Sequence, residues 1–457
     1  MLKRFSESIY FVNNMAKKIL TGPIIFTNTD TNPILESGGI LMDNGDILEI
    51  GQINKLKKAN PEAMAIDLGD GLLTPGLVNI HHHLYSSLAR GWNPGGASPE
   101  NFPQVLDRIW WKLDKALRIE DIYYSAIVGL AESVLSGVTA VIDHHASYGA
   151  ITGSLDTVAE AFGLIGIKGS LCFELSDRAG KEAFKAGIKE TVTALKKWSA
   201  ISKESHLQAM TGLHASMTLS DASLKRIREA TGDFEAGYHF HLAEDKSDQD
   251  DCQTKHKMRI VERLAKLELL GNKSLAIHGV HLSEDEIKIL HQTDTNLALC
   301  PRSNQNNAVG FPKWWNYEGI NIGIGTDGIG SDIIGEAKSA LYISRHTSGQ
   351  PDFGFGLLSD LLLDNNPKIF HRLTGHQVGK IAVGYPADMV LWRYNPPTPL
   401  NKDNIWGHYL YGLYNQHADS VWIDGKRILR NGEFIHFDYD ELLTKARLSA
   451  QSLWEQA

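Results

Sequence analysis

The alternation of apolar and polar positions divides the chain into three parts. From residue 19 to about 70, short apolar runs alternate with turn residues, and Asn44-Gly45 stands between two such runs. A two-residue hairpin turn favours this pair because both positions need a positive φ. Residues 375–457 show the same pattern, with Asp424-Gly425 and Asn431-Gly432 as turn signals. We therefore expect one β-rich module assembled from both ends of the chain.

The middle of the chain, residues 75–374, has a different period. Short apolar runs such as VTAVID and NLALC alternate with longer segments whose apolar residues recur at helical spacing. In the segment EDIYYSAIVGLAESVLSG, Asp121 stands near the expected helix start, and Gly137 stands where a residue often follows a helix. Strand–helix alternation over about 300 residues predicts a parallel sheet, and about eight such units suffice for a (β/α)8 barrel.

This division predicts an α/β fold with two domains. Residues 75–374 would form a TIM-like (β/α)8 barrel that carries the catalytic site, and residues 1–74 and 375–457 would form a small β-sandwich domain. A doubly wound open sheet is the alternative, although no GxGxxG motif follows the first strand. Residues 1–14 precede a second methionine, and we interpret them as an extension without structural consequence.

Composition narrows the classes of function. The chain carries 45 Lys and Arg against 54 Asp and Glu, a formal net charge of −9. Because binding phosphates requires a basic face, we expect no nucleic-acid partner. The chain lacks the run of about 18 apolar residues that a membrane span needs, and its N-terminal apolar run is too short for a signal peptide. The three separated cysteines, Cys172, Cys252 and Cys300, predict a reduced, cytoplasmic protein.

Histidines end two of the apolar runs with the spacing of metal ligands. Side chains alternate along a strand, so His81 and His83 in NIHHHLYSS share one face and can bind one ion, whereas His82 points away. The run GYHFHLAED repeats the pattern with His239 and His241, and spacing alone does not decide which of them is a ligand.

Carboxylates complete this candidate constellation. Asp327 ends the run INIGIGTDG between glycines, where a ligand can approach the backbone closely. Glu244 follows the second histidine pair, and a carboxylate beside a metal moves protons in metal-assisted hydrolysis. His278 ends a further run, SLAIHG. Taken singly, each acid is equally well a loop residue, but all these run ends meet at one mouth in a parallel barrel. The pattern therefore predicts a metal-dependent hydrolase.

These motifs, in this order, resemble the amidohydrolase superfamily and specifically its ATZ/TRZ branch of aminohydrolases and chlorohydrolases. The resemblance runs from about residue 19 to about residue 437 and includes TPGLVNIHHHLYSSLARG, HFHLAED, AIHGVHLSED, GIGTDG and GYPADMVLW. Three further stretches, IWWKLDKAL, AVIDHHAS and LCFELSDRAG, are most similar to the SsnA-type aminohydrolases of that branch, for which the resemblance implies no particular substrate.

The resemblance implies a role for each residue of the constellation. It selects His241 over His239, and it implies one divalent metal, zinc before iron or manganese, because no lysine ends the LQAMTGLHAS run where binuclear relatives carry a bridging carboxylated lysine. The implied metal ligands are His81, His83, His241 and Asp327, the implied catalytic residues are Glu244, His278 and Asp327, and His214 is an implied substrate contact.

The expected reaction is hydrolytic deamination of a small N-heterocycle through a metal-bound hydroxide. Chlorohydrolase or cyclic amidohydrolase activity at the same site is the alternative, followed by a barrel that serves as a non-catalytic scaffold. Adenosine-type deaminases of the branch hold a ribose with an acidic residue, but Trp110, Trp111 and Leu113 stand there, which argues against a nucleoside. Asp143, His145, Glu174 and Arg178 are candidates for a more polar pocket, with His145 and Arg178 as substrate contacts. Helix 102–117 would cap the pocket, pack on the core or contact another subunit, and the resemblance favours a homodimer.

Overall fold

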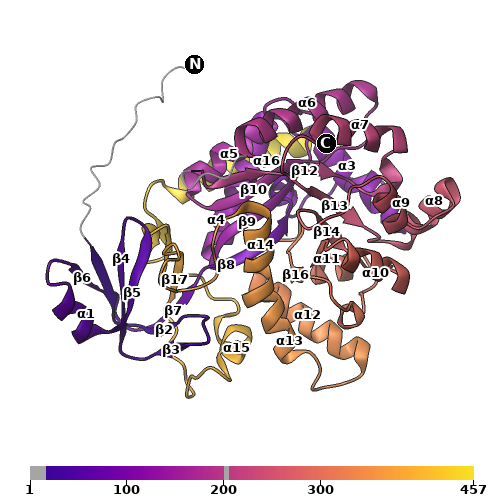
Figure 1. Cartoon of the computed structure of the whole chain (residues 1–457). Coiled ribbons are helices and arrows are strands. Elements are labelled where there is room, and N and C mark those ends of the chain that lie inside the picture. Colours follow the sequence, from indigo (N-terminus) through magenta and orange to yellow (C-terminus); the bar gives the residue numbers. More distant parts are fainter. Residues whose placement is uncertain (1–16, 200–204) are drawn as a thin grey trace.

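Parallel strands alternate with helices through the centre of the chain (Figure 1). We analysed a computed structural model that describes residues 17–199 and 205–457, so the expectation about residues 1–14 lies outside the described residues. One parallel sheet has the order β11-β10-β9-β8, and a second has the order β12-β13-β14-β15-β16. The strands are β8 (Leu77–His82), β9 (Val138–His145), β10 (Lys168–Phe173), β11 (Leu207–Ala209), β12 (Thr211–Leu213), β13 (Tyr238–Leu242), β14 (Leu275–His278), β15 (Asn296–Leu299) and β16 (Ile322–Ile324).

Isolated parallel bridges join the two sheets at both of their ends. Leu175, just after β10, pairs with Leu213 of β12, and His82 of β8 pairs with Asp327, just after β16. These bridges continue strand pairing from one sheet to the other, and the expected parallel α/β architecture is confirmed.

Helices connect these strands as the hydrophobic period predicts. Helix α4 (Ile119–Leu135) begins where the backbone N–H of Arg118 donates to Asp121 at 3.0 Å, and it ends before Gly137, whose φ is +80°. An added Cβ at Gly137 would meet the Trp392 ring, so the position requires glycine for both conformation and space. The other long connecting helices are α5 (Ser154–Ile165), α6 (Lys181–Trp198), α7 (Asp221–Thr231), α8 (Lys246–His256), α9 (Ile260–Lys266), α10 (Glu284–Gln292), α12 (Ile333–Ser348) and α14 (Asn366–Thr374).

Both ends of the chain contribute to one mixed sheet, as the sequence predicts. Strand β17 (Met389–Trp392) runs antiparallel to β7 (Leu72–Pro75) within the order β20-β19-β18-β17-β7-β2-β3, and a second sheet has the order β5-β4-β1-β6. The three expected hairpin turns are present, with positive φ at both residues of each Asx-Gly pair. The remaining strands are β1 (Lys18–Thr21), β2 (Ile24–Phe26), β3 (Ile34–Leu35), β4 (Gly38–Asp43), β5 (Asp46–Gln52), β6 (Met64–Asp67), β18 (Ser420–Ile423), β19 (Lys426–Arg430) and β20 (Glu433–Phe434).

A buried ion pair links the parallel sheet to the mixed sheet. Lys168, at the start of β10, places its Nζ 2.7 Å from Asp388 Oδ2 and 2.7 Å from Asp424 Oδ1. Asp388 precedes β17, and Asp424 lies in the turn between β18 and β19. Lys168 and Asp388 are both buried. A charged side chain at this depth requires a partner, so the ion pair fixes where the two parts of the chain meet.

The last helix departs from the β-rich pattern of the C-terminal part. Helix α16 (Tyr439–Gln456) packs on α4, and Ser449 Oγ donates to Asp121 Oδ1 at 2.5 Å. Trp454 Nε1 donates to the backbone oxygen of Leu88 at 2.8 Å, which ties the helix to the segment after β8. The C-terminal end of the chain therefore packs on the helices around the parallel strands and not on the mixed sheet alone.

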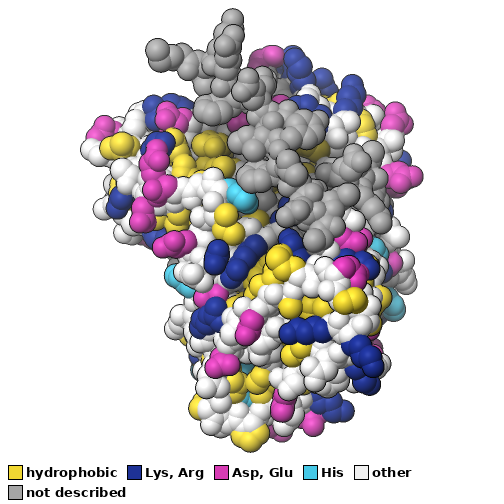
Figure 2. Space-filling view, turned by 90° about the vertical axis from the view of Figure 1, so that its left-hand side faces the viewer, with side chains coloured by type: hydrophobic (Ala, Val, Ile, Leu, Met, Phe, Trp, Pro, Cys, Tyr) yellow, Lys and Arg dark blue, Asp and Glu magenta, His cyan; other side chains and the backbone are white. Residues whose placement is uncertain are grey.

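The surface shows mixed charge on the face that Figure 2 presents. Lysine and arginine side chains are interspersed with aspartate and glutamate over the visible part of the described residues. Within residues 17–199 and 205–457, no helix is long and apolar enough to cross a membrane.

Candidate active site

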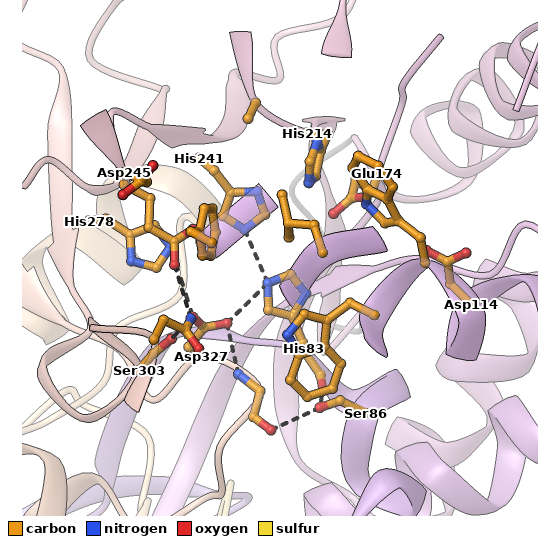
Figure 3. A pocket seen from close by; sticks show the side chains of 18 of the residues that line it. His83, Ser86, Asp114, Glu174, His214, His241, Asp245, His278, Ser303 and Asp327 are labelled. Atoms are coloured by element: carbon orange, nitrogen blue, oxygen red, sulfur yellow. Dashed lines mark hydrogen bonds and ion pairs between the residues drawn. The ribbon is translucent and has the colours of Figure 1, made fainter. Parts of the chain in front are cut away.

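A cleft opens where the parallel strands end (Figure 3). It encloses about 770 Å³ of empty space that is open to solvent. Its floor contains His83, His241, His278 and Asp327, which come from the ends of β8, β13 and β14 and from the loop after β16. Run ends that are far apart in sequence therefore meet, as parallel strands require.

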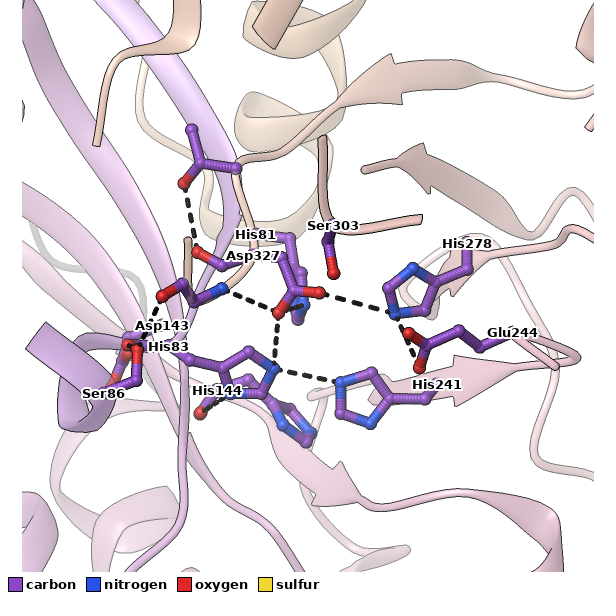
Figure 4. A network of polar contacts seen from close by, with 12 residues as sticks. His81, His83, Ser86, Asp143, His144, His241, Glu244, His278, Ser303 and Asp327 are labelled. Carbon is purple, nitrogen blue, oxygen red and sulfur yellow. Dashed lines mark hydrogen bonds and ion pairs between the residues drawn. The ribbon is translucent and has the colours of Figure 1, made fainter. Parts of the chain in front are cut away.

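Three of the four residues expected to bind metal approach one another directly in this cleft (Figure 4). His83 Nε2 lies 3.1 Å from His241 Nε2 and 3.2 Å from Asp327 Oδ1. His81 Nε2 lies 3.7 Å from the same Asp327 oxygen. These nitrogens and the carboxylate oxygen point toward one small volume, and such a set of donors suits a divalent transition metal.

Protein partners hold the ligand rings from behind. His81 Nδ1 lies 2.9 Å from His239 Nε2, and His83 Nδ1 lies 2.6 Å from the backbone oxygen of His144. In each ring Nε2 therefore remains available to bind a metal ion. His81 Nε2 is buried without a hydrogen-bond partner among the described residues. Burial without a partner is costly for a polar atom, so the residues fit a bound cation. His82 points away, as expected, with Nε2 2.9 Å from Ser331 Oγ.

The electrostatics of the floor favour neutral histidines beside an ionised aspartate. Burial lowers the pKa of His81, His83 and His241, which leaves the imidazoles neutral. Burial alone would raise the pKa of Asp327, but the close approach of His81, His83 and His278 holds it well below its usual range. Neutral imidazole and ionised carboxylate are the forms that bind metal.

Glu244 and His278 face each other at the edge of the floor. His278 Nε2 lies 3.3 Å from Glu244 Oε2 and 3.9 Å from Asp327 Oδ2. Burial, followed by the charge of Asp327, raises the pKa of the Glu244 carboxyl, and burial lowers the pKa of His278 to about 4. A carboxyl group with a raised pKa can accept and return a proton near neutral pH.

Two asparagines that the sequence reasoning missed orient this pair. Asn307 donates to Glu244 Oε1 at 3.3 Å, and Asn304 Nδ2 lies 3.0 Å from His278 Nδ1. Both come from the short helix α11 (Pro301–Asn306) and its end, directly after β15. The apolar run NLALC is followed directly by Pro301, and this pattern could have predicted the short helix, because proline favours the first turn of a helix.

Left-handed backbone occurs at the ends of three strands that form the floor. The φ angles are +46° at Ala243, +73° at His278 and +56° at Asp327. Each bends the chain sharply after β13, β14 or β16, and residues with a Cβ adopt this conformation at an energetic cost. Such strain is often concentrated at functional sites.

The residues expected to contact substrate divide into two groups. His214 lines the cleft, and its Nδ1 lies 2.9 Å from Thr218 Oγ1. His145 and Arg178 do not line it. His145 is buried with Nε2 2.8 Å from Ser147 Oγ, and Arg178 lies behind the wall against two carboxylates that do line the cleft, Asp114 and Glu174. Asp143 is buried too and accepts from the backbone N–H of Leu84.

The segment 102–116 forms a wall of the cleft. It is broken into helix α2 (Phe102–Val105), a π-helical turn η2 (Leu106–Trp110) and helix α3 (Trp111–Ala116), so it caps the pocket but is not one regular helix. Asp114, one residue beyond Leu113, lines the cleft but pairs with Arg178, so the absence of a ribose-binding acid in this segment stays a prediction. The wall residues of this segment are Phe102, Leu106, Trp110, Trp111 and Asp114.

Comparisons with known proteins place this site in a family. Residues 72–428 match the sequence pattern of the Amidohydrolase family, which includes the strands and the cleft described above. The chain belongs to the amidohydrolase family. This amidohydrolase is 28% identical to the 5-methylthioadenosine/S-adenosylhomocysteine deaminase of Desulforudis audaxviator over 427 residues, which cover 92% of this chain and 95% of that protein.

Solved structures share the fold of the amidohydrolase. An adenosine deaminase from Xanthomonas campestris with bound zinc has a TM-score of 0.81 at 20% identity, covering 96% of this chain and 98% of that one. The atrazine chlorohydrolase of Arthrobacter aurescens, complexed with zinc, has a TM-score of 0.79 at 18% identity, covering 95% and 100%. Family membership makes the protein a hydrolase that acts on carbon–nitrogen bonds, and it supports a divalent metal.

Proposed function

We propose that this amidohydrolase removes an amino group from a small N-heterocycle with one zinc ion at the floor of the cleft. The ligands would be His81, His83, His241 and Asp327. The observation that carries the proposal is the convergence of buried Nε2 atoms on the Asp327 carboxylate, with no other hydrogen-bond partner for His81 Nε2 among the described residues. Three imidazoles and one carboxylate suit zinc, and iron and manganese accept the same set.

The protein groups around that centre have separate tasks in deamination. A bound divalent ion supplies a nucleophile at neutral pH by lowering the pKa of water to about 7. Glu244, whose pKa is raised by burial, would take up a proton at the floor of the cleft and pass it to the departing amine. His278 lies 3.3 Å from Glu244, so it is placed to hold the attacking oxygen while the proton moves. His214 contacts the heterocycle from the far wall.

We extend the proposal to the domain architecture and the location of the protein. The two parallel sheets would be the halves of one (β/α)8 barrel of residues 75–374, which the bridges Leu175–Leu213 and His82–Asp327 support. The mixed sheet shared by residues 1–74 and 375–457 would be the β-sandwich domain, which the pairing of β7 with β17 supports. Three buried free cysteines agree with a reducing cytoplasmic location.

Ammonia release from a panel of amino-substituted heterocycles tests the function. The purified protein is loaded with zinc and assayed with purines, purine nucleosides, pyrimidines and triazines, and chloride and ring-opened products are measured in parallel. We expect ammonia from at least one class. Release of chloride, or ring opening, without ammonia would favour chlorohydrolase or cyclic amidohydrolase activity over deamination. Absence of both turnover and bound zinc would favour a non-catalytic scaffold.

The variant Glu244→Gln separates the proton shuttle from the metal site. It keeps the shape of the side chain but removes the base, so turnover should fall about 100-fold to 10,000-fold while zinc content stays at one ion per chain. Glu284→Gln, at an exposed glutamate in α10, is the matched control and should retain full activity. Full activity in Glu244→Gln would refute the proposed role of Glu244, and loss of zinc would show that this carboxylate is itself a ligand.

A further inference from the structure

The cleft is lined by acidic side chains without a basic counterpart. No lysine or arginine lines it within the described part of the chain. The zinc of the proposed function would neutralise part of this charge at the floor, where its ligands lie. The acidic residues lining the cleft are Asp114, Glu174, Glu244, Asp245, Asp248 and Asp327.

Two of these carboxylates already have a structural role. Asp245 accepts from the backbone N–H of Ser247 at 2.9 Å and caps helix α8, and Asp248 accepts from the backbone N–H of Met217 at 2.9 Å. Burial raises the pKa of Asp248 to about 7, which reduces its negative charge at neutral pH. Glu174 and Asp114 lie on the opposite wall of the cleft from His278 and Asp245 (Figure 3).

One buried arginine serves both carboxylates of that wall. Arg178 Nη2 lies 2.5 Å from Asp114 Oδ2 and 3.4 Å from Glu174 Oε1, and its Cζ lies 4.0 Å from the centre of the Tyr148 ring. The short, two-point contact with Asp114 is the ordinary geometry of a paired arginine. Since Arg178 lies behind the wall, with its side chain 7% exposed, it is not free to bind a substrate carboxylate.

Glu174 is therefore the surplus negative charge of the wall. His144 Nδ1 lies 3.5 Å from Glu174 Oε2, longer than a normal hydrogen bond. One guanidinium therefore serves two carboxyl groups, and the Glu174 side chain lines the cleft while almost completely buried.

Aromatic rings line the cleft beside this charge. Tyr85, Trp110 and Trp111 all line the cavity, and Arg178 Cζ already lies 5.2 Å from the centre of the Trp111 ring, which leaves Tyr85 and Trp110 as the rings open to a ligand. An aromatic face next to a carboxylate is an arrangement that recognises cations, since both attract positive charge in a desolvated site.

We propose that the substrate is a cationic N-heterocycle and that Glu174 binds its positively charged end, while the reacting amino carbon faces Glu244. This inference rests on the proposed deamination and specifies its substrate class. Because the cleft holds no free guanidinium or ammonium group, a substrate with a carboxylate at the same end is disfavoured. Glu174 is then a specificity-determining residue and not part of the proton transfer.

Three matched compounds test the charge preference directly. They are 6-aminopurines that carry a propylammonium, a hydroxypropyl or a carboxyethyl group at N9, and an aminotriazine series with the same three groups repeats the test on a second ring. We expect kcat/KM for ammonia release to be about tenfold higher for the cationic than for the neutral member, as one charge-assisted contact provides, and lower again for the anionic member. An anionic member that equals or exceeds the cationic one would overturn the proposal.

The variant Glu174→Gln tests the residue. The ratio of kcat/KM between the cationic and the neutral compound should fall close to one, whereas Glu182→Gln, an exposed glutamate in α6, should keep the wild-type ratio. Zinc content is measured alongside, because Glu174 lies within 4.8 Å of donor atoms of His83 and His241. An unchanged ratio, or loss of zinc in Glu174→Gln, would remove the assigned role.

Binding by the wild-type protein keeps the test independent of catalysis. If no compound releases ammonia, the proposed deamination fails, but the order of the three compounds in competitive binding or in thermal stabilisation still tests the charge preference. The cationic compound binding most tightly supports the inference, and equal binding of all three contradicts it. The same measurement decides the matter if Glu174→Gln does not fold.

Discussion

The hydrogen bond behind His81 offers a test of the proposed metal site that does not touch a ligand. His81 Nδ1 lies 2.9 Å from His239 Nε2, and both rings are fully buried. If Nδ1–H of His81 donates to His239, Nε2 of His81 stays unprotonated and free to bind the ion. In His239→Asn the shorter side chain withdraws this acceptor. The tautomer of His81 with a proton on Nε2, which cannot bind metal, then becomes competitive.

The size of the expected loss in zinc affinity follows from the role of this hydrogen bond in orienting His81. A neutral hydrogen bond contributes about 0.5 to 1.5 kcal/mol, and the loss of a partner that orients a ligand histidine typically weakens metal binding about 10-fold to 100-fold. The expected loss of zinc-binding free energy is therefore about 1.4 to 2.8 kcal/mol, at 1.4 kcal/mol for each factor of ten. At saturating zinc, His239→Asn should recover most of its activity, because the ligands themselves remain.

Competition with a chelator of known zinc affinity measures this effect. His82→Asn is the matched control, since His82 belongs to the same histidine run but faces Ser331, and its zinc Kd should stay within about twofold of wild type. Equal zinc affinity in His239→Asn and the wild-type protein would refute the reasoning. It would mean that the ring of His81 is held by packing alone.

Three further substitutions test the fold around the site. Lys168→Met leaves the buried Asp388 without its cation and should cost about 3 to 5 kcal/mol in urea unfolding; a loss below 1 kcal/mol would show that the ion pair does not hold the two sheets together. Burial raises the pKa of Asp143 to about 7, so the folded protein keeps a proton there that the unfolded chain releases near pH 4. Stability contributed by this group falls as pH rises from about 4 to 7. The free energy of unfolding of Asp143→Asn should therefore increase, relative to that of the wild type, by on the order of 1 kcal/mol for each pH unit over that range. A difference in unfolding free energy that does not change with pH would contradict the raised pKa of Asp143. Gly137→Ala adds a Cβ 2.4 Å from the Trp392 ring at a φ of +80° and should lower the free energy of unfolding by about 2 kcal/mol or more, whereas a neutral effect would mean that the ring moves freely.

Local pattern predicts much of this molecule because it determines strand ends and turns. The hairpin signal at Asn44-Gly45 and the helix end at Gly137 depend on φ, which neighbouring residues fix. The same logic brings His81, His83 and Asp327 together, since alternation selects the face and parallel pairing brings strand ends to one edge. Whether these residues bind zinc stays a prediction until metal is measured.

Contacts between distant segments are where prediction from sequence fails. Arg178 is a polar loop residue in the sequence, but its partner Asp114 lies 64 positions earlier, so its role as a buried counter-ion depends on tertiary structure. Asn307 likewise reaches Glu244 across 63 positions. The apolar stripe of residues 102–117 predicts a helix correctly but not its π-helical turn, because a stripe reports which side is buried and not the local hydrogen-bond register.

The left-handed backbone at His278 and Asp327 separates what folding favours from what the site requires. Glycine at either position would relieve about 1 kcal/mol or more of backbone strain, and each is already followed by a glycine. A mutant library selected only for folded protein should therefore enrich glycine at positions 278 and 327, and a library selected for turnover should eliminate it. Comparing the two enrichments at single-residue resolution would reveal the active site without any substrate-bound structure.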